Sequence, residues 1–336
     1  MVLCKKSGSS QPTPVKKTDS RLLRREFNTL LPSFYMTIIA SSVCTLINGL
    51  IVGNFIGTTD LAAVGIAAPF TQILAIFYST VSSGSQAVCC QYIGRGDKKK
   101  ADAVFSTALF VSGLLGLLLT VSCVGFAVPV ARLLGADASL APLTARYIRG
   151  LAVGFIPCLL NPILMTFIQM GSHPKKSIAA VVLQTIVNLS LDYLFIIVMH
   201  KSLFYASLAS SLGAMAALIY LGVTYARQDN IAMFRVSYIT LRFVTPIFRF
   251  GFLQAVTFGM CAARGVVFSH LLMSSGGADA ASAWSVMLNV TVPIAALDLG
   301  TEQVCEAMFS VSVGEKDSYS VRQIWNIMLV WGGLYI

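Results

Sequence analysis

Four of the 14 acidic residues lie inside long apolar segments, whereas the other ten lie in polar segments of the chain. These four are Asp192, Asp298, Glu302 and Glu306. A charged side chain at the centre of a bilayer costs about 2.5–3.5 kcal/mol on insertion scales, so a residue of this kind usually marks a functional site. Binding and release of a proton or a cation at such a carboxylate is the chemistry that an ion-coupled transporter requires.

Asp192 and Asn188 are four residues apart, which places both side chains on one face of a helix. A carboxylate and an amide on one face can bind a cation together. The same pair can instead form a polar clamp, because side chains of this kind make hydrogen bonds between helices in membranes. The residue types and the spacing leave both interpretations open.

Asp298, Glu302 and Glu306 recur every four residues and predict a stripe of carboxylates along one face of a helix. Three like charges at this spacing cannot all be ionised in a dry environment. We therefore expect the stripe to line a water-filled substrate cavity that attracts cations. In a second interpretation, Arg264 in the preceding apolar segment neutralises Asp298, and Glu306 is solvated at the end of its helix.

The elements that position these residues are predicted to be membrane-spanning helices. Only 11% of the 336 residues are charged, against roughly 25% in soluble proteins, and 56% are apolar. A spanning helix requires about 20 mostly apolar residues, and in lipid only helices and closed barrels satisfy their own backbone groups. Continuous apolar runs favour helices over the alternating pattern of a barrel. Eight stretches are long enough: 29–53, 61–93, 103–131, 148–170, 178–199, 203–226, 243–272 and 280–313.

The basic residues predict the orientation of the chain. Of the 24 Lys and Arg residues, 19 fall in the N-terminal tail and the alternate connections on the same side, four fall on the opposite side, and Arg264 lies inside a span. Because basic residues accumulate on the cytoplasmic side, we expect the N-terminus in the cytoplasm. This distribution accounts for the net charge of +10, so nucleic acid is not expected as a partner.

An internal repeat at an offset of 220 residues predicts two related lobes. Gly94 and Gly314 end equivalent spans, and Asp97 and Asp317 follow them at the same offset. Six spans separate equivalent points, so the lobes share one orientation and are related by a pseudo-two-fold axis along the membrane normal. The expected organisation is a basic cytoplasmic tail, a six-helix lobe, a linker between the lobes and a partial second lobe: 1–28, 29–227, 228–242 and 243–336.

Six motifs, in this order, resemble the multidrug and toxic compound extrusion (MATE) family of cation-coupled exporters. They are Leu31-Pro32, Val52 to Gly57, Leu61 to Gly65, Gly94 to Asp97, Gly171 to Lys175 and Asn188 to Asp192. The resemblance implies an all-α, multi-pass membrane protein with one complete six-helix lobe and a second lobe truncated at its C-terminal end. It further implies a monomeric antiporter in the cell membrane, which exports cationic or amphipathic small molecules and needs no cofactor beyond its coupling ion, H⁺ or Na⁺.

The resemblance also implies a cation site in the first lobe. Asp192 matches the carboxylate of that site and Asn188 matches its amide. The polar residues that join the site from three other helices are matched by Asn48, Asn161 and Ser210. Asn48 departs from the family, in which many members have aspartate, so one carboxylate remains. Neutral oxygen ligands and one carboxylate suit Na⁺ or a single proton, because hard cations prefer oxygen. No other metal is expected.

Two alternative functions are compatible with the same sequence. A lipid-linked oligosaccharide flippase of the same superfamily would favour a large cavity with cationic side chains, whereas the spans of this chain contain one arginine and up to four carboxylates. The other alternative is a truncated membrane protein without transport activity. An enzyme is not supported, because the sequence contains neither a G-x-S-x-G nor an H-E-x-x-H motif.

Overall fold

The computed structural model of the chain describes residues 20–55, 58–134, 136, 138, 140–171, 175–199, 202–227 and 231–334. These residues form helices joined by short connections, and no strand occurs among them. The long helices are α2 (Ser20–Phe55), α3 (Thr58–Gly94), α4 (Lys98–Gly125), α6 (Ala141–Ala152), α7 (Phe155–Met170), α8 (Lys175–Asp192), α9 (Leu203–Ala226), α10 (Val244–Gly314) and α11 (Ser318–Leu334). The shorter ones are α5 (Ala127–Leu133), the π-helix η1 (Tyr193–Val198) and the 3₁₀-helices η2 (Val236–Tyr238) and η3 (Leu241–Phe243).

Five helices in the described part of the chain are long and apolar enough to span a membrane, and six if α6 and α7 form one bent span. The axes of α6 and α7 differ by 44°. Pro157 in the first turn of α7 explains this break, because proline cannot donate the backbone hydrogen bond that would continue α6. The predicted spans 29–53 and 280–313 are not among these six, although both are helical as parts of α2 and α10.

The core of the first lobe lies where α3, α4, α7 and α9 meet. Phe105 of α4 is in contact with aromatic rings on both sides, at 4.7 Å between ring centroids for Phe167 of α7 and 4.9 Å for Tyr225 of α9. All three side chains are buried. Aromatic pairs at this separation add attraction beyond the area that they bury, so these rings hold three helices of the lobe together.

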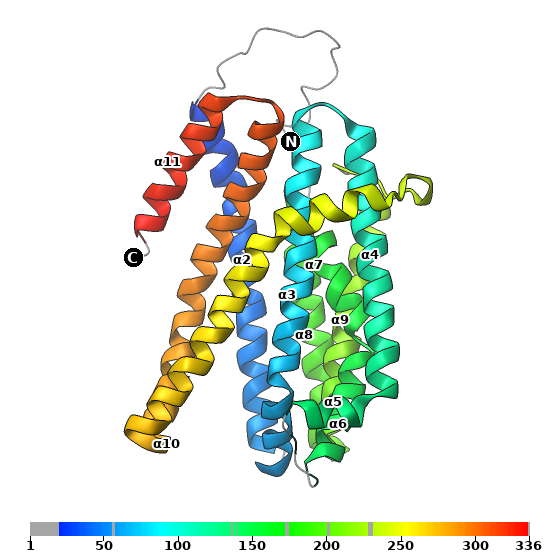
Figure 1. Ribbon diagram of the computed structural model, residues 1–336, viewed down its shortest axis with the longest axis vertical. Helices are drawn as coiled ribbons and strands as arrows, with labels where there is room; N and C mark the ends of the chain where they lie inside the picture. Colours follow the sequence, from blue (N-terminus) through cyan, green and yellow to red (C-terminus); the bar gives the residue numbers. More distant parts are fainter. Residues whose placement is uncertain are drawn as a thin grey trace.

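The helical element α10 turns back on itself. A Cβ atom on Gly84 of α3 would collide with the carbonyl oxygen of Ile247, and one on Gly94 would collide with that of Val311. Gly84 and Gly94 are about 15 Å apart along α3, whereas a straight helix would separate Ile247 from Val311 by about 96 Å. Figure 1 shows the reversal: the yellow first limb crosses α3 obliquely, and the orange second limb returns beside α2. The two limbs correspond to the predicted spans 243–272 and 280–313.

The second limb of α10 meets α3 in a contact that we call the seam, between residues 83–94 and 303–314. Gly94 lies against Val311, and Gly314 lies against Gln91, each close enough to exclude a Cβ atom. Gln91 and Val311 are themselves 220 residues apart, so the contact is reciprocal. Reciprocal contacts are the signature of a two-fold interface. The repeated glycines therefore lie beside the pseudo-two-fold axis that the sequence predicts.

The turns after the two repeated glycines have the same conformation. Gly96 has φ of 74°, and the equivalent Lys316 has φ of 58°. The carboxylate of Asp97 accepts a hydrogen bond from the backbone N–H of Lys100 at 3.2 Å, and that of Asp317 accepts one from Ser320 at 3.2 Å. Each aspartate caps the helix that follows it, which is why the residue type repeats.

The connection between the lobes is held against α4. The carboxylate of Asp102, which is buried, accepts a hydrogen bond from the backbone N–H of Met233 at 2.7 Å. Ser106 accepts one from the N–H of Arg235 at 2.9 Å, and Thr107 accepts one from the N–H of Thr240 at 3.1 Å. These side chains give the described linker residues, 231–242, the backbone partners that an extended segment otherwise lacks.

Candidate functional site

Asp192 is the last residue of α8 and is completely buried, with 0% of its surface exposed. Neither carboxylate oxygen has a hydrogen-bond partner among the described residues. Buried polar atoms in native proteins almost always have a partner, and an orphaned carboxylate is the costliest exception. A bound proton or a cation would supply the missing interaction.

The π-helix η1 starts directly after Asp192, at Tyr193. Single π-helical turns are rare and occur frequently at functional sites, because the wider turn redirects the side chains on either side of it. No feature of the sequence indicated this π-helix. The helical geometry therefore changes directly after Asp192, whose carboxylate is buried and has no partner among the described residues.

Asn188 and Ser210 lie together one turn from Asp192. The Asn188 amide donates a hydrogen bond to the Ser210 hydroxyl at 3.1 Å and is itself buried. The amide of Asn161 in α7 donates a hydrogen bond to the carbonyl of Ala214 at 2.9 Å. Ala214 lies one turn after Ser210 in α9. The carbonyl oxygen of its side chain has no partner among the described residues. The structure thus brings Asn188 and Ser210 into direct contact, whereas Asn161 contacts α9 four residues away, at Ala214.

Small residues allow the helices around Asp192 to approach one another closely. A Cβ atom on Gly213 of α9 would lie 2.9 Å from the carbonyl oxygen of Gln184 and 3.2 Å from the Cβ of Asn188. On the other side of α9, Ser211 donates a hydrogen bond to the carbonyl of Gly150 in α6 at 2.8 Å. This close packing of small residues is the usual way in which helices associate in membranes.

Two further positions complete the comparison with the predicted site. Tyr147 of α6 is near enough for an electrostatic interaction between its phenol and the Asp192 carboxylate, and it was not among the predicted site residues. Tyr147 lies just before the predicted span 148–170, between Arg146 and Ile148, so no sequence pattern distinguished it. Asn48 lies in α2, but its side chain is outside the described part of the structure.

Glu306 lies in the seam. Its carboxylate accepts a hydrogen bond from the Ser83 hydroxyl of α3 at 2.6 Å. The Gln86 side chain donates a hydrogen bond to the backbone carbonyl of Gln303 at 3.1 Å. Ser83 and Gln303 are equivalent at the offset of 220, as are Gln86 and Glu306, so these two bonds are related by the pseudo-two-fold axis. The repeated polar positions could have been recognised in the sequence.

The other members of the carboxylate stripe are more open. Glu302 is half-buried and Asp298 is exposed. Arg264 of α10 is also exposed and makes no ion pair with Asp298, although the structure describes both side chains. Among the described residues, no group of three His, Cys, Asp or Glu side chains is placed to hold a metal ion. The stripe therefore runs from the seam, at Glu306, to an accessible surface, at Asp298.

The helices of spanning length, the repeated lobe and the pseudo-two-fold seam define a multi-pass membrane protein built from two related lobes. The MatE family model matches residues 32–194. Over these residues the chain is similar to the MATE family.

Curated relatives are similar over part of their length. The chain is 25% identical over 183 residues to "Probable multidrug resistance protein YoeA" of Bacillus subtilis, a match that covers 54% of this chain and 40% of the relative. It is 24% identical over 260 residues to "Multidrug export protein MepA" of Staphylococcus haemolyticus, with 74% of this chain and 56% of the relative covered. The matches thus span about half the length of these relatives.

Solved structures have the same fold. A crystal structure of MATE in complex with MaD3S matches with a TM-score of 0.84 at 19% identity, over 95% of this chain and 74% of that chain. A MATE family transporter of the MOP superfamily in an outward-facing conformation matches with a TM-score of 0.83 at 19% identity, over 95% and 72% of the two chains.

Proposed function

We propose that this protein is a cation-coupled antiporter that exports small molecules by alternating access. The observation that carries the proposal is the Asp192 carboxylate, which is buried with both oxygens unpartnered among the described residues. A proton or a Na⁺ ion at this carboxylate, next to the amide of Asn188, completes its interactions. The coupling ion is then H⁺ or Na⁺, and no other cofactor is required.

In this proposal, the protein alternates between outward-facing and inward-facing states by closing and opening the seam. The lobes touch through Gly94 and Gly314, at the end of the bundle that carries most of the basic residues. Toward the opposite end, the limbs of α10 diverge from α2 and α3 (Figure 1). With the basic end in the cytoplasm, this arrangement is an outward-facing state, and opening of the seam gives the inward-facing one. Ion and substrate are coupled when they favour different states.

The substrates are proposed to be cationic or amphipathic. Asp298 and Glu302 face more open surroundings than Asp192, and together they provide negative charge on the second limb of α10. The printed names of the relatives, multidrug resistance and multidrug export proteins, support the same substrate class. We further propose that the protein works as a monomer in the cell membrane, with its N-terminus in the cytoplasm.

The test is ion-driven transport of a cationic dye by the full 336-residue chain in proteoliposomes, under an imposed H⁺ or Na⁺ gradient. Asp192→Asn preserves shape but removes the charge, and it should reduce gradient-driven transport by roughly 5–150-fold, the usual range of a coupling free energy. Asp102→Asn is the matched control, because it changes a buried aspartate that is already hydrogen-bonded to Met233. Equal transport by both variants would refute the proposed ion site.

A further inference from the structure

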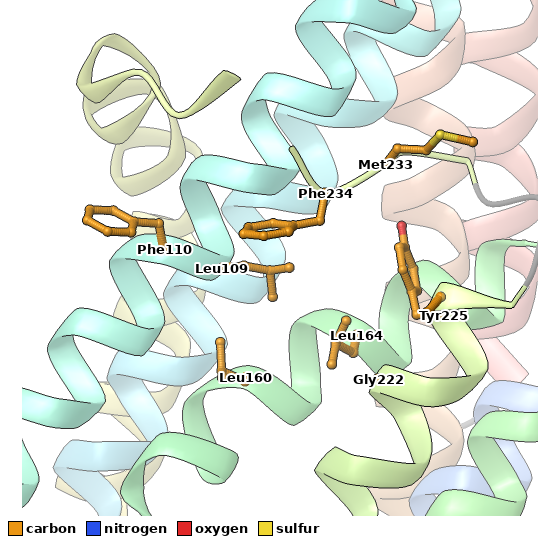
Figure 2. A pocket seen from close by; sticks show the side chains of 9 residues that line it. Leu109, Phe110, Leu160, Leu164, Gly222, Tyr225, Met233 and Phe234 are labelled. Atoms are coloured by element: carbon orange, nitrogen blue, oxygen red, sulfur yellow. The ribbon is translucent and has the colours of Figure 1, made fainter. Parts of the chain in front are cut away.

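An apolar groove lies on the first lobe, away from Asp192 and from the seam. It has a volume of about 600 Å³, within the range of about 300–1,000 Å³ that is usual for small-ligand sites. Its walls come from α4, α7, α9 and the linker. Figure 2 shows Phe234 and Leu109 facing Leu160 and Leu164 across the groove, with Tyr225 at one side.

The groove opens toward lipid. Exposed apolar side chains continue from Phe110 along one face of α4, at the spacing of a helical stripe: Leu114, Leu117, Leu118 and Val121. On α9, Ile219 and Val223 are exposed beside the groove residues Gly222 and Ala226. In a membrane protein, apolar stripes that no other helix covers face the acyl chains of the lipid. The surroundings of the groove are therefore lipid rather than water.

Basic residues directly follow two of the groove residues in the chain. Arg227 follows Ala226, and Arg235 follows Phe234; both are exposed. The guanidinium of Arg235 lies 5.4 Å from the ring centroid of Tyr238, which orients it on the linker. The described linker residues, 231–242, contain two arginines and no acidic residue. The carboxylate of Asp102 nearby is buried and already accepts the N–H of Met233.

We propose that this groove binds one anionic phospholipid from the leaflet on the basic side of the protein. An acyl chain fills the apolar groove, and the phosphate lies at Arg227 and Arg235. Because Met233 and Phe234 belong to the linker, the bound lipid contacts both the first lobe and the segment that leads to the second. The assignment is carried by the combination of an apolar groove, exposed apolar helix faces beside it and two exposed arginines adjacent in the chain to groove residues, and it does not depend on the proposed transport activity.

Gly222 permits a direct test, because no atom lies within 4 Å of the Cβ that a substitution would add there. Gly222→Leu should fill the groove without displacing the backbone. Gly125→Leu is the matched control, since Gly125 has equally open space and lies at the other end of α4. Native mass spectrometry of the purified full chain, titrated with phosphatidylglycerol or with phosphatidylcholine of identical acyl chains, measures the bound lipid. The wild type and Gly125→Leu should retain one phosphatidylglycerol, and Gly222→Leu should lose it.

A second pair of variants tests the charge and does not depend on the folding of Gly222→Leu. Two arginines at a lipid headgroup correspond to a preference for phosphatidylglycerol of roughly 10- to 30-fold in Kd. Arg227→Gln with Arg235→Gln should abolish this preference, whereas Arg132→Gln with Arg146→Gln should preserve it. Phosphatidylglycerol binding by Gly222→Leu equal to that of Gly125→Leu, or an unchanged preference after loss of Arg227 and Arg235, would overturn the assignment.

Discussion

The site around Asp192 and the seam around Glu306 both place a carboxylate inside a helix of a membrane protein, but only one of the two carboxylates has a partner. Glu306 accepts a hydrogen bond from Ser83 across the seam. Asp192 is more deeply buried and has no partner among the described residues. The difference shows that an acidic residue in a span does not by itself indicate an ion site. The identity of its neighbours decides whether it holds a contact together or is available to bind.

The largest expected difference between the two regions is in ion coupling. Glu306→Gln keeps a carbonyl oxygen that can accept the Ser83 hydroxyl, so gradient-driven dye transport should fall less than about tenfold, against the roughly 5–150-fold expected for Asp192→Asn. Both variants are measured in the same proteoliposomes. A larger loss from Glu306→Gln than from Asp192→Asn would reverse the assignment of the two carboxylates.

Thermal stability should depend more strongly on side chains of the seam than on those of the Asp192 site. Ser83→Ala removes the hydroxyl that donates to Glu306 and leaves that carboxyl group without this partner, which is expected to cost about 1–3 kcal/mol. Ser79→Ala is the control, because Ser79 bonds only to the carbonyl of Ile76 in its own helix, at 3.1 Å. Thermal unfolding of the purified chain compares the two, and equal midpoints would show that the Ser83–Glu306 bond does not stabilise the contact between the lobes.

A smaller effect is expected at the turn that follows the seam on α3. Asp97→Ala removes the cap of α4 and should cost about 0.5–2 kcal/mol, toward the lower end because the side chain is partly exposed. The hydrogen bond from the Lys100 side chain lowers the pKa of Asp97 below its ordinary value of 3.8. The stability contributed by Asp97 is therefore complete above the ordinary pKa and is lost as the pH falls through the lowered one. Thermal unfolding of wild type and Asp97→Ala should differ at pH 7 and converge as the pH falls through the lowered pKa; a constant difference would exclude the carboxylate as the cause.

The smallest expected effect is at Lys316, which has a left-handed backbone where its repeat equivalent is Gly96. A non-glycine residue in this conformation costs roughly 1 kcal/mol, so Lys316→Gly should raise the unfolding midpoint slightly. Arg322→Gly, in the helix α11, is the control and should lower it. A lower midpoint for Lys316→Gly would mean that the lysine side chain stabilises the seam more than its backbone strain costs.

Much of the fold follows from local patterns. Apolar runs of spanning length predict helices because lipid leaves the backbone no other partner, and the offset of 220 between Gly94 and Gly314 predicts the two lobes. Asp192 and Asn188 were identified because four residues is one helical turn. The π-helix after Asp192 was not predicted, because its wider turn depends on the packing of α8 rather than on residue type.

The sequence alone determined that this protein is a helical membrane protein with a repeated lobe and that Asp192 is a carboxylate in an apolar segment. These properties depend on composition and on short spacings, which no packing can change. The tertiary structure alone decided that Glu306 bonds to Ser83, 223 residues away, that the linker follows α4, and that an apolar groove opens beside Arg227 and Arg235. Contacts of this kind depend on how two lobes and their connection pack, and residues so distant in the chain carry no local signal of their pairing.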